Sequence, residues 1–250
     1  MQYFTPLAGG RAAAAAILFR MRRNRNTVQS IAYKGNQVRF RGCDEQVLKE
    51  VLVDKEYSFL RNWLSTTPSP RILDVGAHVG TFSIWAFSVN PKARILSVEA
   101  NPDTYQLAEQ NAETLSRKGF DWNVLQYAVW SEDDTMLRFT NTGPTMSHRI
   151  DTDGLIQVPS ISLATLMYKA VPEGKSIDLA KIDIEGSEEA FLCSDPEALK
   201  NIDSLVIELH PQLCDVRRVR KLLKASYDSI KEIDGRVSTK PLWYCRRKKA

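Results

Sequence analysis

The stretch ILDVGAHVGTFS, residues 72–83, decides the fold class because it joins an apolar strand to a helix through a turn with two glycines. Gly76 and Gly80 permit backbone conformations that other residues avoid, and they let the chain approach a ligand at the start of a helix. The alternative is a plain strand-to-helix turn that needs glycine only for its dihedral angles. A dinucleotide site would show the spacing GxGxxG, whereas the spacing here is GxxxG.

Two carboxylates near this turn indicate a ligand without phosphate. Asp74 lies just before Gly76, and a carboxylate repels pyrophosphate but attracts an ammonium group. Glu99 ends the next apolar strand, where an acid can accept hydrogen bonds from both ribose hydroxyls. An ordinary surface acid is the alternative for Glu99 taken alone. Together the two features favour S-adenosylmethionine, which carries an ammonium, a sulfonium and an adenosine.

Outward from this stretch, apolar strands alternate with helical segments, which is typical of a mostly parallel sheet with helices on both faces. Strands are predicted at 71–76, 93–100, 122–130, 135–140, 177–186 and 204–211, and a terminal hairpin at 229–247 that turns at Asp234-Gly235. Helices are predicted at 77–90, 102–119, 187–200 and 215–227, with a further helix within 158–170 and a polar loop at 141–154. The predicted fold class is therefore α/β.

The chain is predicted to have three parts, namely a basic N-terminal segment at 1–26, a cap at 27–66 and an α/β domain at 67–250. In the cap we expect a hairpin over 28–42, turned at Gly35-Asn36, and a helix over 43–64 that covers one edge or the mouth of the sheet. The apolar run in the first segment is eight residues long, and a membrane span needs about 20. It predicts a short helix, with a peripheral helix on anionic lipid as the alternative.

The net charge of +4 is concentrated at the two ends of the chain. Five arginines lie in the first 25 residues and four bases near the C-terminus, and without these nine the 25 remaining bases face 30 acids. A mildly acidic body is not typical of a nucleic-acid-binding domain. Basic ends favour at most a peripheral contact with anionic membrane. Four widely spaced cysteines without a CxxC pair fit a reducing, cytoplasmic setting.

The stretch IDLAKIDIEGSEEAF, residues 177–191, ends an apolar strand in a group of carboxylates around Gly186. Acids at the start of a helix favour the positive end of its dipole, which accounts for Glu188 and Glu189. It accounts less well for Asp183 and Glu185, which flank an apolar residue. Strand ends at the carboxyl edge of a parallel sheet are where ligands bind.

The motifs ILDVGAHVGTFS, SVEANP, LAKIDIEGSEEAFL and VIELHP occur in the order and spacing of the FkbM family of S-adenosylmethionine-dependent methyltransferases, which this chain resembles from about Cys43 to His210. The resemblance implies a class I methyltransferase fold, with a Rossmann-like seven-stranded sheet, and methyl transfer to a hydroxyl. It implies cofactor binding by the glycine turn, by two residues at the second strand and by backbone further on. These residues are Asp74, Gly76, Ala77, His78, Gly80, Glu99, Asn101, Ala128, Val129 and Asp183. One departure is Ala164, where members often carry an aspartate.

A hydroxyl is a weak nucleophile, so the reaction needs a group that removes its proton. We expect Asp183 or His210 to act as the general base, with Glu185 positioning the acceptor hydroxyl. A backbone-bonded strand-end histidine is the alternative for His210. Lys181 is a further catalytic candidate, although a lysine extending along the strand is the simpler interpretation. A divalent metal such as Mg²⁺ or Ca²⁺, held by Asp183 and Glu185 with Glu208 or His210, is possible but not favoured.

The acceptor is expected to be a small molecule or glycan with a free hydroxyl, most simply a sugar in a glycoside, an oligosaccharide or a lipid-linked glycan. Polar residues of the 141–154 loop suit such an acceptor, and Thr145, Ser147 and His148 are the candidates. A solvated surface loop is the alternative. A polyketide-like secondary metabolite is the second acceptor class, and a non-catalytic interaction module is the alternative function.

Overall fold

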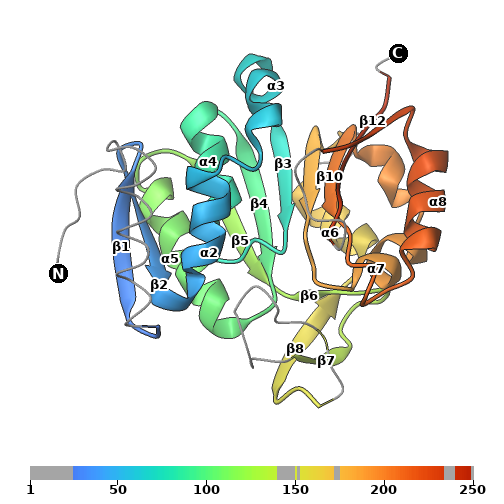
Figure 1. Ribbon diagram of the computed structural model, residues 1–250, viewed down its shortest axis with the longest axis horizontal. Coiled ribbons are helices and arrows are strands. Elements are labelled where there is room, and N and C mark those ends of the chain that lie inside the picture. The colour runs from blue at the N-terminus through green and yellow to red at the C-terminus, as the bar shows by residue number, and fades with distance from the viewer. Residues whose placement is uncertain (1–24, 140–149, 151–152, 172–174, 234–239, 249–250) are drawn as a thin grey trace.

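The computed structural model describes residues 25–139, 150, 153–171, 175–233 and 240–248, and its centre is a seven-stranded sheet (Figure 1). The strand order is β11-β12-β10-β9-β3-β4-β5, and β12 alone runs antiparallel to its neighbours. The strands are β3 (Arg71–Val75), β4 (Arg94–Glu99), β5 (Asp121–Gln126), β9 (Leu179–Ile182), β10 (Ser204–Glu208), β11 (Ser229–Glu232) and β12 (Leu242–Arg246). This confirms the predicted α/β class and its mostly parallel sheet.

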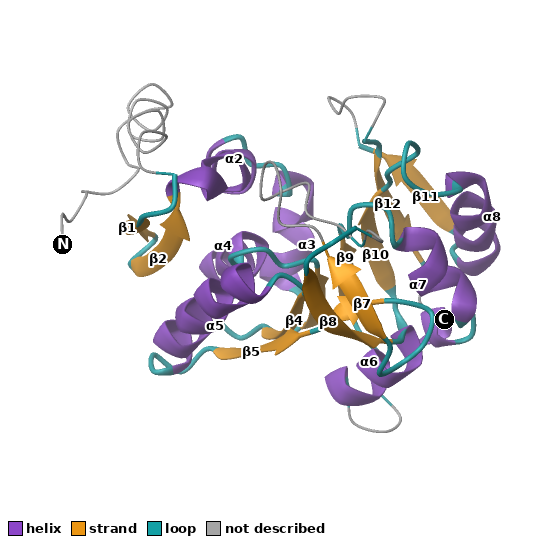
Figure 2. Cartoon of the chain, turned by 90° about the horizontal axis from the view of Figure 1, so that it is seen from below, coloured by secondary structure: helices purple, strands orange, loops and turns teal. Residues whose placement is uncertain are grey.

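Helices cover both faces of the sheet because alternate strand residues point to opposite sides. Ile72 of β3 joins the core beneath two helices, whereas Leu73 and Val75 join the core beneath three others. The first face carries α4 (Thr81–Val89) and α5 (Pro102–Ser116), and the second carries α6 (Leu163–Ala170), α7 (Glu188–Ser194) and α8 (Val216–Ser226). The two groups are separated by the strands when the molecule is seen from below (Figure 2).

The N-terminal hairpin pairs β1 (Val28–Tyr33) with β2 (Asn36–Arg41) and lies against α5. Tyr33 pairs with Asn36, so the two-residue turn is Lys34-Gly35, one residue before the predicted Gly35-Asn36 turn. Both turn residues have positive φ, 48° and 81°, as a tight hairpin turn requires. The side chain of Asn111 on α5 fastens the hairpin, since it accepts from the Arg39 backbone N–H at 2.7 Å and donates to the Arg39 carbonyl at 2.9 Å.

The single helix predicted at 43–64 was wrong, because this segment is a series of short turns of helix. They are η1 (Gly42–Asp44), α2 (Glu45–Leu48), η2 (Lys49–Val53), η3 (Ser58–Leu60) and α3 (Arg61–Thr66). The break between η2 and η3 contains Lys55 at a φ of 60°. It turns Tyr57 into the core, where its ring lies 4.8 Å from that of Phe82. Burial of this aromatic side chain outweighs the continuity of a helix.

A second sheet, not predicted from the sequence, lies at the carboxyl edge of the first. It has the order β6-β8-β7 and consists of β6 (Ala128–Val129), β7 (Met136–Phe139) and β8 (Ile156–Ile161). The strand predicted at 122–130 is therefore divided between two sheets. The segment before α6 is a strand, and α6 begins only after Ser162, whose hydroxyl accepts from the Thr165 N–H at 3.3 Å. Ala128, Phe139 and Val158 give this sheet a small core of its own.

The helix predicted at 187–200 was too long, since α7 ends at Ser194 and a separate turn, η5 (Ala198–Asn201), follows. Asp195 precedes a proline, which disfavours helical backbone, and its φ and ψ are −137° and 79°. The predicted pairing of the last two strands is confirmed. Their predicted turn at Asp234-Gly235 and the segment 1–24 lie outside the described residues.

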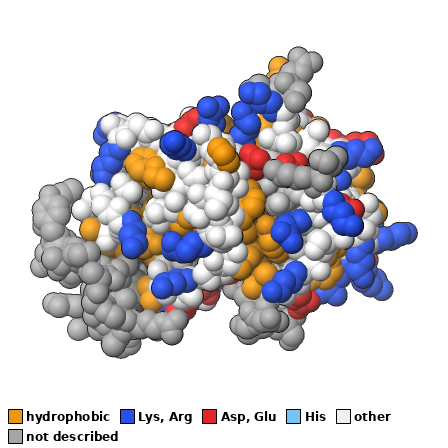
Figure 3. Space-filling view, turned by 90° about the horizontal axis from the view of Figure 1, so that it is seen from above, with side chains coloured by type: hydrophobic (Ala, Val, Ile, Leu, Met, Phe, Trp, Pro, Cys, Tyr) orange, Lys and Arg blue, Asp and Glu red, His pale blue; other side chains and the backbone are white. Residues whose placement is uncertain are grey.

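Lys and Arg side chains are spread across the face seen from above, with Asp and Glu side chains among them (Figure 3). Among the described residues we find no helix with the length and apolar character that a bilayer-spanning segment requires.

Candidate active site

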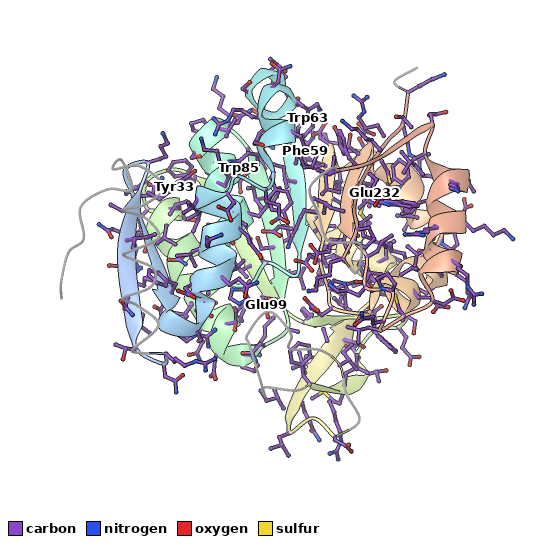
Figure 4. All side chains as sticks on the ribbon, in the orientation of Figure 1. Tyr33, Phe59, Trp63, Trp85, Glu99 and Glu232 are labelled. Atoms are coloured by element: carbon purple, nitrogen blue, oxygen red, sulfur yellow. The ribbon has the colours of Figure 1, made fainter. Side chains whose placement is uncertain are left out.

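A cavity of about 420 Å³ lies at the carboxyl ends of β3, β4, β9 and β10, the edge where open α/β sheets bind ligands. Figure 4 shows Glu99 at the carboxyl end of β4, which is the lower end of the strand in that view. The ionisable side chains that line the cavity are Glu50, Glu56, His78, Glu99, Lys181, Asp183, Glu185, Glu208 and Lys240. Carboxylates outnumber lysines among them by six to two, so the cavity favours ligands with positive charge.

The glycine turn after β3 lines the cavity with Gly76, Ala77 and His78. Gly76 has a φ of 75°, and a Cβ atom there would lie 1.8 Å from the carbonyl oxygen of Asp183. Gly80 has a φ of 86°, and a Cβ there would lie 2.5 Å from the Trp122 ring. Both glycines are thus required by the packing of the chain itself, in addition to any contact that the turn makes with a ligand.

Glu99 is held in place by backbone N–H groups. One carboxylate oxygen accepts from the His78 N–H and the other from the Asn101 N–H, each at 2.9 Å. Burial raises the pKa of Glu99, against the opposing effect of these two hydrogen bonds. Each oxygen keeps a second lone pair, and the side chain lines the cavity. Glu99 is therefore a preorganised acceptor for hydroxyl groups of a ligand.

Asp74 lies beneath the turn and is not among the residues that line the cavity. Its carboxylate is fully buried, 3.3 Å from the Lys181 Nζ, and accepts a hydrogen bond from the Ser83 hydroxyl at 2.7 Å. Lys181 also donates to the Gly76 carbonyl at 2.6 Å. Burial alone would lower the pKa of Lys181, but Asp74 and Asp183 outweigh it, and the pKa is raised. Lys181 is therefore a cation that ties the glycine turn to β9.

The DIEG turn after β9, residues 183–186, packs directly against the glycine turn. The Asp183 N–H donates to the Val75 carbonyl at 3.1 Å, so the ends of β3 and β9 stay side by side. Glu185 has a φ of 45° and Gly186 a φ of 101°. These positive angles reverse the chain and direct both carboxylates, Asp183 and Glu185, toward the cavity. The strained φ of Glu185 is typical of a residue at a functional site.

His210 follows β10 and lies among four carboxylates. The Nε2 atom of its ring is 3.4 Å from a Glu185 oxygen, 3.5 Å from a Glu208 oxygen and 3.9 Å from an Asp183 oxygen. Its Nδ1 hydrogen-bonds to Glu188. The ring is almost completely buried, and within the described residues Nε2 has no well-formed hydrogen bond. Burial lowers the pKa of His210, but Glu185 and Glu188 outweigh it and raise the pKa to about 9.

Glu188 holds the imidazole from behind. Its side chain is fully buried, accepts from the Cys214 thiol at 3.1 Å and from the Gly186 N–H at 3.3 Å. The sequence interpretation placed Glu188 only as a dipole-favoured residue at a helix start. Glu189, its neighbour, faces away and pairs with Arg218 at 2.6 Å. The first of these two adjacent acids therefore belongs to the site and the second to the surface.

Several residues of the cavity wall were not predicted from the sequence. Lys240 is one, with its Nζ 2.8 Å from a Glu185 oxygen and 3.6 Å from a Glu208 oxygen. The cap supplies others, including Glu50, Glu56 and Tyr57. No motif marks these positions, although the expectation that the cap covers the mouth of the sheet pointed to its helices. Lys240 lies at the cavity because it is two residues before β12, which pairs with β10 in the sheet.

Of the remaining residues predicted to bind the cofactor, some line the cavity and others do not. Ala128 and Val129 of β6 line the cavity, whereas Gly80 and Asn101 do not. The Asn101 side chain instead caps α5, accepting from the Asp103 and Thr104 N–H groups. The acceptor candidates Thr145, Ser147 and His148 lie outside the described residues.

Comparison with known proteins identifies the family of this chain. Residues 74–229 match the methyltransferase FkbM domain. This chain belongs to the FkbM methyltransferase family. A hexuronic acid methyltransferase, AglP of Haloferax volcanii, is 27% identical over 151 residues, which are 60% of this chain and 59% of that protein. Methyltransferase 1 of Beauveria bassiana is also 27% identical, over 72% of this chain and 79% of its own length.

Solved structures of low sequence identity share the fold of this FkbM family member. Magnesium protoporphyrin IX methyltransferase from Synechocystis PCC 6803, with bound SAH, gives a TM-score of 0.52 at 13% identity and covers 94% of this chain and 95% of its own. The N-terminal domain of EvdMO1, also with SAH bound, gives a TM-score of 0.51 at 14% identity and covers 94% and 97%. The class I methyltransferase fold that the family resemblance implies is thus confirmed.

Proposed function

We propose that the protein is an S-adenosylmethionine-dependent O-methyltransferase that methylates a hydroxyl group, most simply on a sugar. The observation that carries the proposal is the cavity that Glu99 lines at the end of one strand and Asp183 and Glu185 line at the end of another. Family membership supports methyl transfer as the reaction class. The two similar solved structures contain the demethylated cofactor, which supports this cofactor for the present chain.

The residues of the cavity suit the proposed cofactor. S-adenosylmethionine supplies a methyl carbon on a positively charged sulfur, and the C–S bond breaks with its electron pair staying on sulfur as the acceptor oxygen bonds to that carbon. Glu99 would accept hydrogen bonds from the ribose hydroxyls. The excess of carboxylates around the cavity would hold the cationic part of the molecule. Gly76 keeps its backbone open to the cavity, and Asp74 supports this turn through Lys181.

The carboxylates after β9 are placed to act on the acceptor. The acceptor hydroxyl must lose a proton as its oxygen attacks the methyl carbon. Asp183 lines the cavity, so a hydroxyl that reaches its carboxylate lies beside a group that can take its proton. His210 lies 3.9 Å from that carboxylate but does not line the cavity, and with a pKa of about 9 its ring already holds a second proton at neutral pH. Glu185 and Lys240 would position the acceptor from the other side of the pair.

A sugar is the favoured acceptor because polar and ionised groups dominate the part of the cavity next to Asp183. The similarity to a hexuronic acid methyltransferase supports the same class. A polyketide-like hydroxyl is the second class to test. The decisive experiment measures binding of S-adenosylmethionine and of NADH by calorimetry, and then the release of S-adenosylhomocysteine with uronic acids, neutral sugars, amino sugars and phenolic polyketides. Binding of NADH alone, or no methyl transfer to any hydroxyl, would contradict the proposal.

Replacing Glu99 by glutamine is expected to weaken binding of S-adenosylmethionine by about 10- to 100-fold, since hydrogen bonds to a charged group contribute roughly 1.5–3 kcal/mol. In the wild type, affinity should fall as the pH is lowered through the raised pKa of Glu99, because the protonated carboxyl is the weaker acceptor. In Glu99→Gln this dependence should disappear. Calorimetry between pH 5 and 8 is the measurement, and Glu113→Gln on the exposed face of α5 is the control. An unchanged affinity would remove Glu99 from the cofactor site.

A further inference from the structure

We propose that Asp183, Glu185 and His210 form a binding site for one divalent cation, with Mn²⁺ as the best-suited ion. The site itself is inferred from geometry, whereas its role in methyl transfer rests on the proposed function. The three side chains offer two carboxylate oxygens and one imidazole nitrogen, and these atoms lie within 4.8 Å of one another.

Two of the three distances between the donor atoms can be compared with those around a bound cation. Metal–ligand bonds of about 2.0–2.2 Å place neighbouring donors about 3.0 to 3.5 Å apart. The His210 Nε2 is 3.4 Å from the Glu185 oxygen and 3.9 Å from the Asp183 oxygen. The second distance shortens by rotation of Asp183, whose side chain is 30% exposed. Binding of the cation thus requires the Asp183 carboxylate to move toward the other two donors, which begin within 4.8 Å of it.

The imidazole has the orientation of a metal ligand. In the neutral imidazole whose proton lies on Nδ1, beside Glu188, the lone pair is on Nε2, and this atom faces Asp183 and Glu185. A cation bound there would displace the proton that Nε2 carries in the protonated ring. Within the described residues, the buried Nε2 and the buried Asp183 Oδ1 have no hydrogen-bond partner. A carboxylate that holds the far nitrogen is the usual support of a metal-binding histidine. The Cys214 thiol and the Gly186 N–H fix that carboxylate in turn.

The charges around His210 also call for a cation. Four carboxylates surround it, those of Asp183, Glu185, Glu188 and Glu208, and the Lys240 ammonium contacts two of these. Even with a protonated imidazole, negative charge exceeds positive charge by two. Buried charges without partners are costly. A divalent ion at the three donors would balance this excess.

The donor set distinguishes between ions. Oxygen ligands alone would favour Mg²⁺ or Ca²⁺, whereas the imidazole nitrogen shifts the preference toward Mn²⁺ or Zn²⁺. A cation here would lower the pKa of an acceptor hydroxyl and hold its oxygen in line with the methyl carbon. The hydroxyl proton would pass to Glu208, which lines the cavity beside the three ligands. The C–O bond forms and the C–S bond breaks as in the reaction without metal.

The test is direct binding of Mn²⁺ to the full chain after treatment with a chelator. Binding is measured by calorimetry and by the loss of the electron paramagnetic resonance signal of free Mn²⁺. We expect one equivalent to bind. Asp183→Asn and Glu185→Gln should each weaken binding by at least about 10-fold, as removal of supporting residues at metal sites does. Glu189→Gln is the matched control, because this acid adjoins Glu188 but pairs with Arg218, and it should leave Mn²⁺ binding unchanged.

A second variant has the opposite expected effect. Lys240→Met removes the ammonium that now contacts Glu185 at 2.8 Å, so Mn²⁺ should bind more tightly, by about 2- to 5-fold if the ion pair contributes up to about 1 kcal/mol. Lys200→Met, which breaks an exposed pair with Glu197 at η5, is its control. A gain of affinity cannot come from a damaged fold, so this variant answers the question even if the others unfold.

The outcomes separate the cation site from the proposed function. No saturable binding of Mn²⁺, Zn²⁺, Mg²⁺ or Ca²⁺, or binding unaffected by Asp183→Asn and Glu185→Gln, would overturn the cation site. If methyl transfer then proceeds at full rate in chelator, the proposed function stands without metal. Specific Mn²⁺ binding in a protein that does not bind S-adenosylmethionine would leave the cation site in place and refute the methyltransferase function.

Discussion

Replacing Asp183 by asparagine is expected to reduce the rate of methyl transfer by about 10²- to 10⁴-fold, the usual contribution of a group that removes a proton in the transition state. Asp183 lines the cavity and faces His210 at 3.9 Å, and asparagine keeps its size but cannot take a proton. The measurement is the initial rate of S-adenosylhomocysteine release with the acceptor found by screening. Saturating cofactor is used so that a weaker cofactor contact does not itself lower the rate.

The matched control for this variant is Asp121→Asn. Asp121 is the first residue of β5, where its exposed side chain lies 3.9 Å from Arg94, at the opposite edge of the sheet from the cavity. It should keep the wild-type rate. Full turnover by Asp183→Asn would exclude the carboxylate from the chemistry, both as a base and as a ligand of a catalytic cation.

Replacing Gly76 by alanine is expected to cost about 3 to 5 kcal/mol of unfolding free energy, from strain at positive φ and from overpacking. The new Cβ would lie 1.8 Å from the Asp183 carbonyl oxygen, which is backbone and cannot turn away. In a chain of this size the melting temperature should fall by about 10 °C. Thermal and denaturant unfolding monitored by circular dichroism are the measurements.

Gly119→Ala isolates the cause of this loss. Gly119 has a φ of 90° but nothing within 4 Å of its would-be Cβ, so only the backbone strain of about 1–2 kcal/mol applies. The difference between the two variants measures the close approach of the glycine turn to β9. Equal losses in both would show that the ends of β3 and β9 separate freely, and that Gly76 does not hold Asp183 in place.

These two predictions concern one contact, in which the cofactor turn and the DIEG turn meet. The Gly76 backbone touches Asp183 on one side, and its carbonyl accepts from Lys181 on the other. A change in either turn therefore moves the other. The positions proposed for cofactor and acceptor are coupled through the backbone rather than through side chains that a ligand would displace.

The α/β architecture was predictable because its signals are local. Apolar strands of five or six residues, such as β3 and β4, are each followed by a glycine or an asparagine cap and then by a helix. The second sheet was not predictable in the same way. Its strand β8 contains a proline and pairs with β7, across a loop, and with β6, so its stability depends on partners that no local pattern reveals.

The sequence by itself determined the family, the α/β class and which strand ends carry acids, because each of these depends on residue type and spacing along the chain. Only the tertiary structure decided which acids act together. Glu188 and Glu189 are adjacent and chemically alike, yet one supports His210 and the other pairs with Arg218. Asp74 faces Lys181 beneath the glycine turn, and the Lys240 ammonium, two residues before β12, contacts Glu185. Such pairings join residues far apart in the chain, and they are set by how strands and turns pack rather than by their order.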